Sequence, residues 1–216
     1  MKFFRIIFLG FVTLLTASGC DSETVEPVGV DTTEVITNVV EINTTDIDGL
    51  KFMREEEKLA RDVYISLFAM YDNQVFNNIS NSEQRHMDEV LKLLNTYNIE
   101  DPSLDETGKF SNQILQQLYD DLMAQGSISE VEALIVGATI EDVDIRDLEL
   151  FITETTNEDI IKVYEFLNCG SRNHMRAFIS RLNDLGVTYT PQFITQEQFD
   201  SIINGDKEKC GQNYNR

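Results

Sequence analysis

The chain has 216 residues, of which 42% are hydrophobic, and it carries 38 acidic against 17 basic residues, for a net charge of −21. This length and composition suffice for one substantial hydrophobic core. The charge excludes nucleic acid as a partner, and contact with anionic lipid headgroups, because both would be repelled. The absence of a phosphate-binding glycine loop and of a Gly-x-Ser-x-Gly motif argues against nucleotide-dependent and serine-nucleophile enzymes.

The first twenty residues have the pattern of a bacterial lipoprotein signal. Lys2 and Arg5 precede an apolar run, residues 6–15, that is too short to span a bilayer in the mature protein. Small residues then lead to Cys20, which resembles a lipoprotein cleavage box; the alternative is an ordinary signal peptide with Cys20 incidental. We expect residues 1–19 to be a lipoprotein signal peptide and Cys20 to carry lipid. The expected localisation is the bacterial cell envelope, lipid-anchored outside the cytoplasm.

Residues 20–46 are rich in Thr, Val, Glu and Asp without a helical period, and they are predicted to be a flexible tether. Two further cysteines, Cys169 and Cys210, lie in the remaining chain. In an oxidising compartment such a pair favours a disulfide that ties the C-terminal tail to a helix; the alternative is two free or buried thiols.

Helical periodicity predicts an all-α protein. Residues 47–187 are predicted to form a helical bundle, and residues 188–216 a short C-terminal helix and a tail. Ser80 and Ser129 each precede a glutamate by three residues, as in a capping box, and Asn157 and Thr195 are further candidate caps. The helices expected on these grounds cover residues 48–71, 80–97, 111–125, 129–151, 157–186 and 195–205. The third of these is an extra helix in the connection between the halves of the bundle.

Four of the long helices carry polar residues in the middle of an otherwise apolar stripe. Glu57 interrupts the first stripe, while Glu55 and Glu56 fall off its centre and are expected to be solvated. The interrupting residues are Glu57; Glu83 with His86; Glu141 with Asp144; and His174. His86 and His174 are the only two histidines of the chain. Because Glu83 and His86 are three residues apart on a helix, both side chains can reach one ion.

Several carboxylates buried together would have to protonate unless a cation balanced them. A divalent or trivalent metal does so, and carboxylate and imidazole ligands in a helix bundle are typical of di-iron and di-manganese sites. No cysteine lies on these faces, which argues against a thiolate zinc site. The expected metal ligands are Glu57, Glu83, His86, Glu141, Asp144 and His174.

The order of these residues resembles that of the ferritin-like superfamily, and of rubrerythrin-type bundles in particular. More closely, residues 55–64 (EEEKLARDVY) and 170–178 (GSRNHMRAF) resemble an uncharacterised ferritin-like family, domain of unknown function 2202 (DUF2202). The resemblance covers about residues 50–187 and implies a ferritin-like four-helix bundle with iron as cofactor, manganese or zinc being alternatives. It implies a role beside the ligands for Tyr64. The pattern departs at Ser171, where a glutamate is expected, so the centre is either dinuclear, with Asp144 compensating, or mononuclear.

Three functions remain open at this point. The first is a di-iron carboxylate redox protein that reacts with oxygen or peroxide and has an unidentified redox partner. The second is an envelope metal-binding module without turnover, and the third is a metal-free structural or interaction lipoprotein on the same scaffold. The membrane, through the N-terminal lipid, is the expected partner; nucleic acid and nucleotides are not. A homodimer is left open.

Overall fold

The computed structural model describes residues 42–211, which lie in the second of two units into which the chain divides, 1–39 and 40–216. The prediction of an all-α protein is confirmed: the described residues form α-helices and contain no strand. The helices are α1 (Thr44–Tyr71), α2 (Gln74–Thr96), α3 (Gln113–Gly126), α4 (Glu130–Glu154), α5 (Glu158–Asp184) and α6 (Gln196–Asn204). None of these helices is both long and apolar enough to cross a bilayer.

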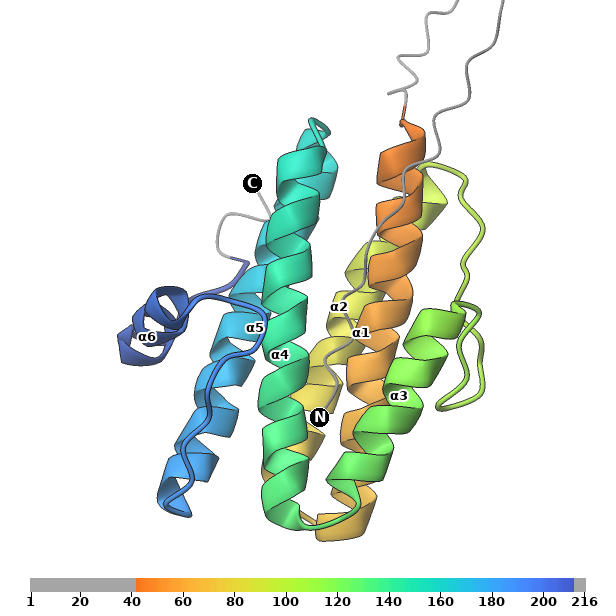
Figure 1. Ribbon diagram of the computed structural model, residues 1–216. Helices are drawn as coiled ribbons and strands as arrows, with labels where there is room; N and C mark the ends of the chain where they lie inside the picture. The colour runs from red at the N-terminus through yellow and green to blue at the C-terminus, as the bar shows by residue number, and fades with distance from the viewer. Residues whose placement is uncertain (1–41, 212–216) are drawn as a thin grey trace, which may run out of the picture. The chain divides into compact units, whose positions relative to one another are not determined.

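The four long helices pack side by side as two antiparallel pairs, α1 with α2 and α4 with α5 (Figure 1). Between the pairs, α1 contacts α4 and α2 contacts α5. The short helix α3 lies against α1 and α4, and α6 packs on α5. A residue in the middle of each long helix can therefore face residues from the other three.

Each helix begins after a short polar residue whose side chain accepts a hydrogen bond from a backbone N–H of the first turn. These caps are Asn43, Asn73, Asn112, Ser129, Asn157 and Thr195. The predicted cap at Ser80 is wrong, because α2 begins at Gln74 and Ser80 lies inside it, with its hydroxyl donating to the Asn77 carbonyl at 3.0 Å. The extra turns form because Val75 and Phe76 are buried in the core.

The hydrophobic core consists of two clusters that lie along the same four helices. One contains Ala60, Ile79 and Met175, and the other contains Met53, Val90 and Leu167. On α1, α2 and α5 the residues between these clusters are polar, namely Glu57, Glu83 with His86, and Ser171 with His174. A buried polar layer thus crosses the bundle between two apolar ones.

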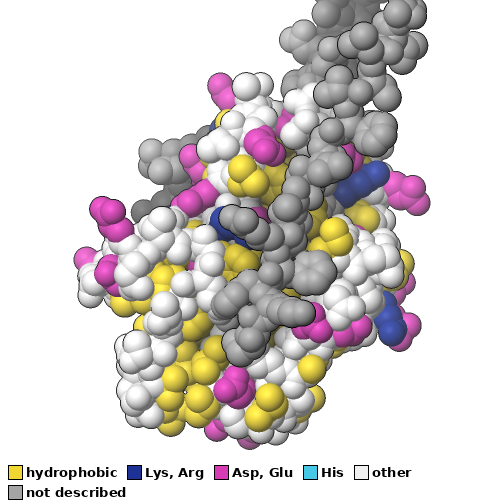
Figure 2. Space-filling view, viewed as in Figure 1, with side chains coloured by type: hydrophobic (Ala, Val, Ile, Leu, Met, Phe, Trp, Pro, Cys, Tyr) yellow, Lys and Arg dark blue, Asp and Glu magenta, His cyan; other side chains and the backbone are white. Residues whose placement is uncertain are grey.

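Helix α1 is buried on nearly all sides, because α3 and the loop of residues 98–112 cover the side that faces away from α2. Residues 53–60 are all buried. The expectation that Glu55 and Glu56 are solvated is wrong, since each is only 3% exposed. Elsewhere on the face formed by α1, α3 and α4, acidic side chains are spread over the surface (Figure 2).

Candidate metal centre

The polar layer brings five of the six expected metal ligands together. Potential ligand atoms of Glu57, Glu83 and His86 lie within 4.8 Å of one another, and those of Glu83, Glu141 and His174 do likewise. Each of these side chains is buried, with exposures between 1% and 7%. Glu83 belongs to both groups, so one carboxylate of α2 lies between the two histidines.

The distances within the groups are those expected of ligands around shared ions. His86 Nδ1 lies 2.7 Å from Glu83 Oε2 and 3.1 Å from Glu57 Oε2. His174 Nδ1 lies 2.9 Å from Glu83 Oε1 and 3.4 Å from Glu141 Oε2. Adjacent ligands of an octahedral ion with bonds of about 2.1 Å are separated by about 3 Å. Each Nδ1 lies near two carboxylates, but a single N–H donates a full hydrogen bond to only one of them. Hydrogen bonding alone therefore does not explain why two carboxylates lie beside each imidazole.

Several atoms at the centre lack hydrogen bonds altogether. His174 Nδ1 and Glu83 Oε1 are close together yet neither has a hydrogen-bond partner in the described part of the chain. Glu57 Oε1 and Asp144 Oδ1 are also buried without a partner. Unpaired buried polar atoms cost about 1–3 kcal/mol each, and more when charged. Their concentration in one layer fits a site whose missing partner is a cation.

Two buried carboxylates outside the groups, Glu55 and Asp142, accept hydrogen bonds from the backbone. Glu55 accepts from the backbone N–H groups of Ser111 and Asn112 at the start of α3. Asp142 accepts from the Tyr189 hydroxyl and from the backbone N–H groups of residues 192–194. These acids hold loops in place, whereas the acids of the polar layer receive no backbone hydrogen bond.

The electrostatics of the centre are those of carboxylates that share protons with imidazoles. Burial raises the pKa of Glu57 to about 7, although His86 opposes the shift. Burial also opposes ionisation of Glu83, but His174 and His86 outweigh it and lower the pKa of that carboxyl. Burial would depress the pKa of His174, but Glu83 and Glu141 raise it to about 10. A metal ion would replace these protons, so its binding would release them.

Asp144, the sixth expected ligand, lies in neither group. Ser171, three residues before His174, donates a hydrogen bond to Asp144 Oδ2. Burial, followed by the charges of Glu57 and Glu141, raises the pKa of Asp144 well above its usual value. Asp144 therefore lies beside both groups, with one oxygen held by Ser171 and the other unpaired.

Three residues outside the two groups contact members of them. The Tyr64 hydroxyl donates to Glu141 Oε1 at 2.5 Å, so it lies beside a member of the second group. The backbone of α5 at Gly170 lies very close to the His86 ring. A Cβ at this glycine would be only 2.5 Å from His86 Cε1 and Nε2. Phe166 packs edge-on against the same ring, with centroids 5.7 Å apart. Sequence reasoning missed Gly170 and Phe166; their spacing of four residues on α5 was the available signal.

Sequence reasoning also missed Glu56. Its pKa is raised well above the usual value by burial and by the neighbouring charges of Asp147 and Asp144, and its Oε2 has no hydrogen-bond partner among residues 42–211. No group of three potential ligands within 4.8 Å includes Glu56 among the described residues. It extends the acidic layer toward α4 without completing a further ligand set.

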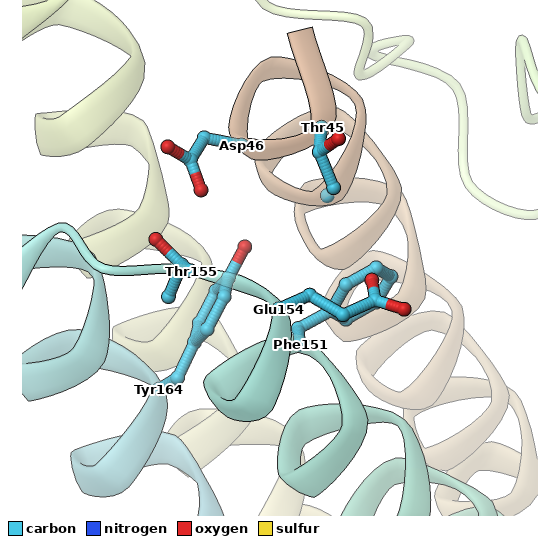
Figure 3. Close-up of a pocket in the computed structure, with 7 residues that line it drawn as sticks. Thr45, Asp46, Phe151, Glu154, Thr155 and Tyr164 are labelled. Atoms are coloured by element: carbon cyan, nitrogen blue, oxygen red, sulfur yellow. The ribbon is translucent and has the colours of Figure 1, made fainter. Parts of the chain in front are cut away.

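A small cavity lies at the end of the bundle where α1 begins and α4 ends. Figure 3 shows the Tyr164 hydroxyl pointing between Asp46 and Thr155, two of the residues that line it. Its volume is about 10 Å³, which is close to the least that a single water molecule needs. The cavity is too small for a substrate, but it could hold a water that pairs with the otherwise unpaired Tyr164 hydroxyl.

Cys169 and Cys210 are joined by a disulfide, with Cα atoms 5.6 Å apart. It attaches the segment after α6 to α5 at the residue before Gly170. Cys20, with the predicted signal peptide and most of the tether, lies outside the described residues.

The chain is similar to known proteins over most of its length. It is 54% identical over 169 residues to "Uncharacterized protein MJ0754" of the archaeon Methanocaldococcus jannaschii, a match that covers 78% of this chain and 91% of the relative. The crystal structure of hypothetical protein MJ0754 superposes with a TM-score of 0.77 and covers 78% of this chain and 97% of the other. The model of an uncharacterised protein domain, DUF2202, matches residues 46–206.

These findings correct the predicted localisation, a lipid-anchored protein of the bacterial cell envelope. The relative that shares more than half of the aligned residues comes from an archaeon, and neither comparison shows a signal peptide or a lipid anchor. The prediction was wrong because it depended on a short N-terminal pattern, residues 1–20, which the family match does not reach. The match over residues 46–206 and the identity to MJ0754 show that the chain belongs to the DUF2202 family.

Proposed function

We propose that this protein is a ferritin-like protein that binds two metal ions, with iron as the expected metal, and uses them in redox chemistry with oxygen or peroxide. The observation that carries the proposal is the position of Glu83. Its Oε2 faces His86 and its Oε1 faces His174, each within 3 Å. A carboxylate between two imidazoles, with a further glutamate beside each, is the arrangement of a bridged dinuclear centre.

The residues present fit such a metal pair. Glu57, Glu83 and His86 would hold one ion, and Glu83, Glu141 and His174 the other. Carboxylate-rich sites with a single imidazole favour iron or manganese over softer metals. When bound, the metal pair would supply the electron exchange with the oxidant. The protein excludes water by burial, orients Glu141 through Tyr64 and orients the His86 ring through Gly170.

The ferritin-like assignment is supported by the placement of these residues. They come from the middles of four long helices arranged as two antiparallel pairs, with α3 in the connection between the pairs. Ferritin-like sites have an acid on each of two helices and Glu-x-x-His on the other two. Here α2 carries Glu83 and His86, whereas on α5 Ser171 replaces the glutamate and binds Asp144 of α4 instead.

That replacement favours a second candidate, metal binding without turnover. The two groups contain five different side chains, so the second ion has fewer carboxylates than the motif would give it. A metal-free scaffold is the least supported function, because it leaves His174 Nδ1 and three carboxylate oxygens of the layer, those of Glu57, Glu83 and Asp144, without partners.

The test is to load the full chain with ferrous iron without oxygen, and then to measure the iron bound and the oxygen or peroxide consumed. A His86→Ala, His174→Ala double variant is the matched control. Consumption that requires bound iron and is lost in the variant supports the redox function. Stoichiometric iron that is oxidised no faster than free iron would leave only the binding function, and absence of iron from the wild-type chain would refute both.

A further inference from the structure

A groove of about 650 Å³ lies between α2 and α5 and is bordered by the segment after α6. This volume is in the range of small-molecule sites, about 300–1,000 Å³. His86, Gly170 and His174 form part of its lining, so the groove reaches the two imidazoles of the proposed centre from the outside. Both rings are almost buried, with side-chain exposures of 3% and 9%, which places them at its floor.

The charge of the groove is opposite to that of the chain. Arg85, Arg181 and Lys207 line it, and Glu208 is the one acid in its lining. The Glu208 carboxylate is already paired with Arg172 and Arg176. The chain has 38 acidic and 17 basic residues, so a groove with more cations than anions reverses the sign of the charge locally.

These three cations form no close ion pair with neighbouring carboxylates of the described residues. Arg85 donates to Ser82 Oγ at 3.1 Å, and Lys207 has no ion pair among the described residues. Arg181 has only a loose pair with Asp184, 3.8 Å apart. Their charge is therefore available to a ligand.

The position of Lys207 is fixed by the segment that carries it. Asn173 of α5 accepts from the Glu208 backbone N–H at 2.9 Å and donates to the Glu208 carbonyl at 3.1 Å. The Cys169–Cys210 disulfide holds the same segment two residues further on. A cation on a segment fixed in advance loses less entropy when it binds a ligand.

The rest of the lining contains both apolar and polar side chains. Val75, Ile79 and Ala177 are among the apolar ones. A ligand that used both the cations and these apolar side chains would have one anionic end and an apolar body.

We propose that the α2–α5 groove binds a small organic anion, a carboxylate with a short apolar chain, next to the metal centre. Arg85 and Lys207 bind its carboxylate, and Val75 and Ile79 contact its chain. That the anion is a substrate or ligand of the metal ions rests on the proposed function; that it binds in the groove does not.

The test is calorimetric titration of the full chain, first stripped of metal by chelation and then loaded with ferrous iron, using hexanoate and its neutral analogue hexanol. We expect hexanoate to bind the stripped protein at least about tenfold more tightly than hexanol, and Arg85→Glu, Lys207→Glu to abolish that difference. The matched control is Lys92→Glu, Lys162→Glu, which reverses two exposed lysines outside the groove lining and should leave binding unchanged.

Two results would overturn the proposal. One is equal binding by the groove variant and the wild type. The other is hexanoate binding that appears only after iron loading and is insensitive to the groove charges, since the carboxylate would then be a metal ligand alone. Metal content measured on each variant separates these results from failure of the metal centre itself.

Discussion

Gly170 has no side chain at the point where α5 passes the ring of His86. A Cβ there would approach the ring to 2.5 Å, closer than packed atoms tolerate. We expect Gly170→Ala to rotate or displace His86 and to lower metal affinity by about 10–100-fold, as changes next to a ligand commonly do. Metal titration followed by elemental analysis measures this effect.

Gly49→Ala is the control for that substitution. Gly49 also lies in a buried helix contact, but a Cβ there would meet Phe151 at 3.2 Å and Tyr164 at 3.3 Å. It should change stability slightly and metal affinity not at all. Equal metal affinity in Gly170→Ala and the wild type would show that His86 is not a ligand held in place by α5.

Sequence periodicity could locate the polar layer because each expected ligand interrupts an apolar stripe. It could not separate Glu57 from Glu55 and Glu56, since the three adjacent acids cover a wide arc of α1 and all are buried. The distinction depends on what each carboxylate meets. Glu55 meets backbone N–H groups of Ser111 and Asn112, which are more than fifty residues away in the chain.

Between elements, a buried ion pair ties α1 to the loop before α3. Lys58 Nζ lies 2.5 Å from Asp62 Oδ2 and donates to the carbonyls of Glu106 and Lys109, with both charged side chains fully buried. The ammonium also lies 4.5 Å from the centre of the Phe110 ring. The loop of residues 98–112 is therefore held by a single side chain at several points.

Lys58→Met should destabilise the protein by about 3 kcal/mol, because it removes the cation from Asp62 Oδ2 and from two buried carbonyls, while Arg61 still pairs with Asp62 Oδ1. Urea unfolding measures this change. Lys92→Met is the matched control, since Lys92 is 67% exposed in its pair with Glu89 and should contribute less than about 1 kcal/mol. A loss of stability no larger for Lys58 than for Lys92 would contradict the structural role of the pair.

The segment after α6 should be sensitive to acid. Hydrogen bonds from Arg172, and then from Arg176, lower the pKa of Glu208 despite partial burial. The unfolded state therefore takes up the proton more readily, so the stabilisation is full above the usual glutamate pKa and is lost as pH falls below it. Because the carboxylate is 30% exposed, the effect is screened to less than about 1 kcal/mol.

Glu208→Gln tests this pH dependence. The difference in unfolding free energy between the wild type and this variant should be larger at about pH 7 than at about pH 3. Denaturant unfolding at both pH values gives the comparison. A difference independent of pH would assign the effect to packing and not to the charge of Glu208.

Helix positions were well predicted where a cap and a periodic stripe agree, as for α5 after Asn157 and α6 after Thr195. They were less well predicted at the start of α2, because Ser80 and Glu83 imitate a capping box inside a helix. In the folded protein Glu83 faces the histidines, and the helix is capped by Asn73, seven residues before Ser80.

For the molecule as a whole, the proposed metal centre predicts that stability depends on metal. Carboxylates of α1, α2 and α4 and imidazoles of α2 and α5 converge between two apolar clusters, and a cation that binds only the folded state stabilises it. At free metal about 100 times the dissociation constant, the gain is about 2.7 kcal/mol. Chelation should lower the thermal midpoint of the wild type by the corresponding amount.

The His86→Ala, His174→Ala double variant provides the comparison for metal removal. Chelation should leave its thermal midpoint unchanged, because the variant lacks both imidazoles. If the wild type and the variant responded equally to chelation, the stabilising metal would be bound elsewhere.

The all-α fold could be predicted from the sequence, and so could the residues that form the polar layer, because both follow from helical periodicity. The pairing of Ser171 with Asp144 could not, since it joins α4 and α5 across the bundle. Nor could the position of Glu83 between the two histidines, which depends on how α1, α4 and α5 pack around α2.

The number of metal ions per chain tests the central claim most directly. It is measured by elemental analysis of iron-loaded full chain, of His86→Ala and of His174→Ala. The bridged centre predicts about two ions in the wild type and about one in each single variant, because each histidine belongs to a different group and both groups share Glu83. One ion in the wild type, or two in either variant, would contradict a dinuclear centre bridged by Glu83.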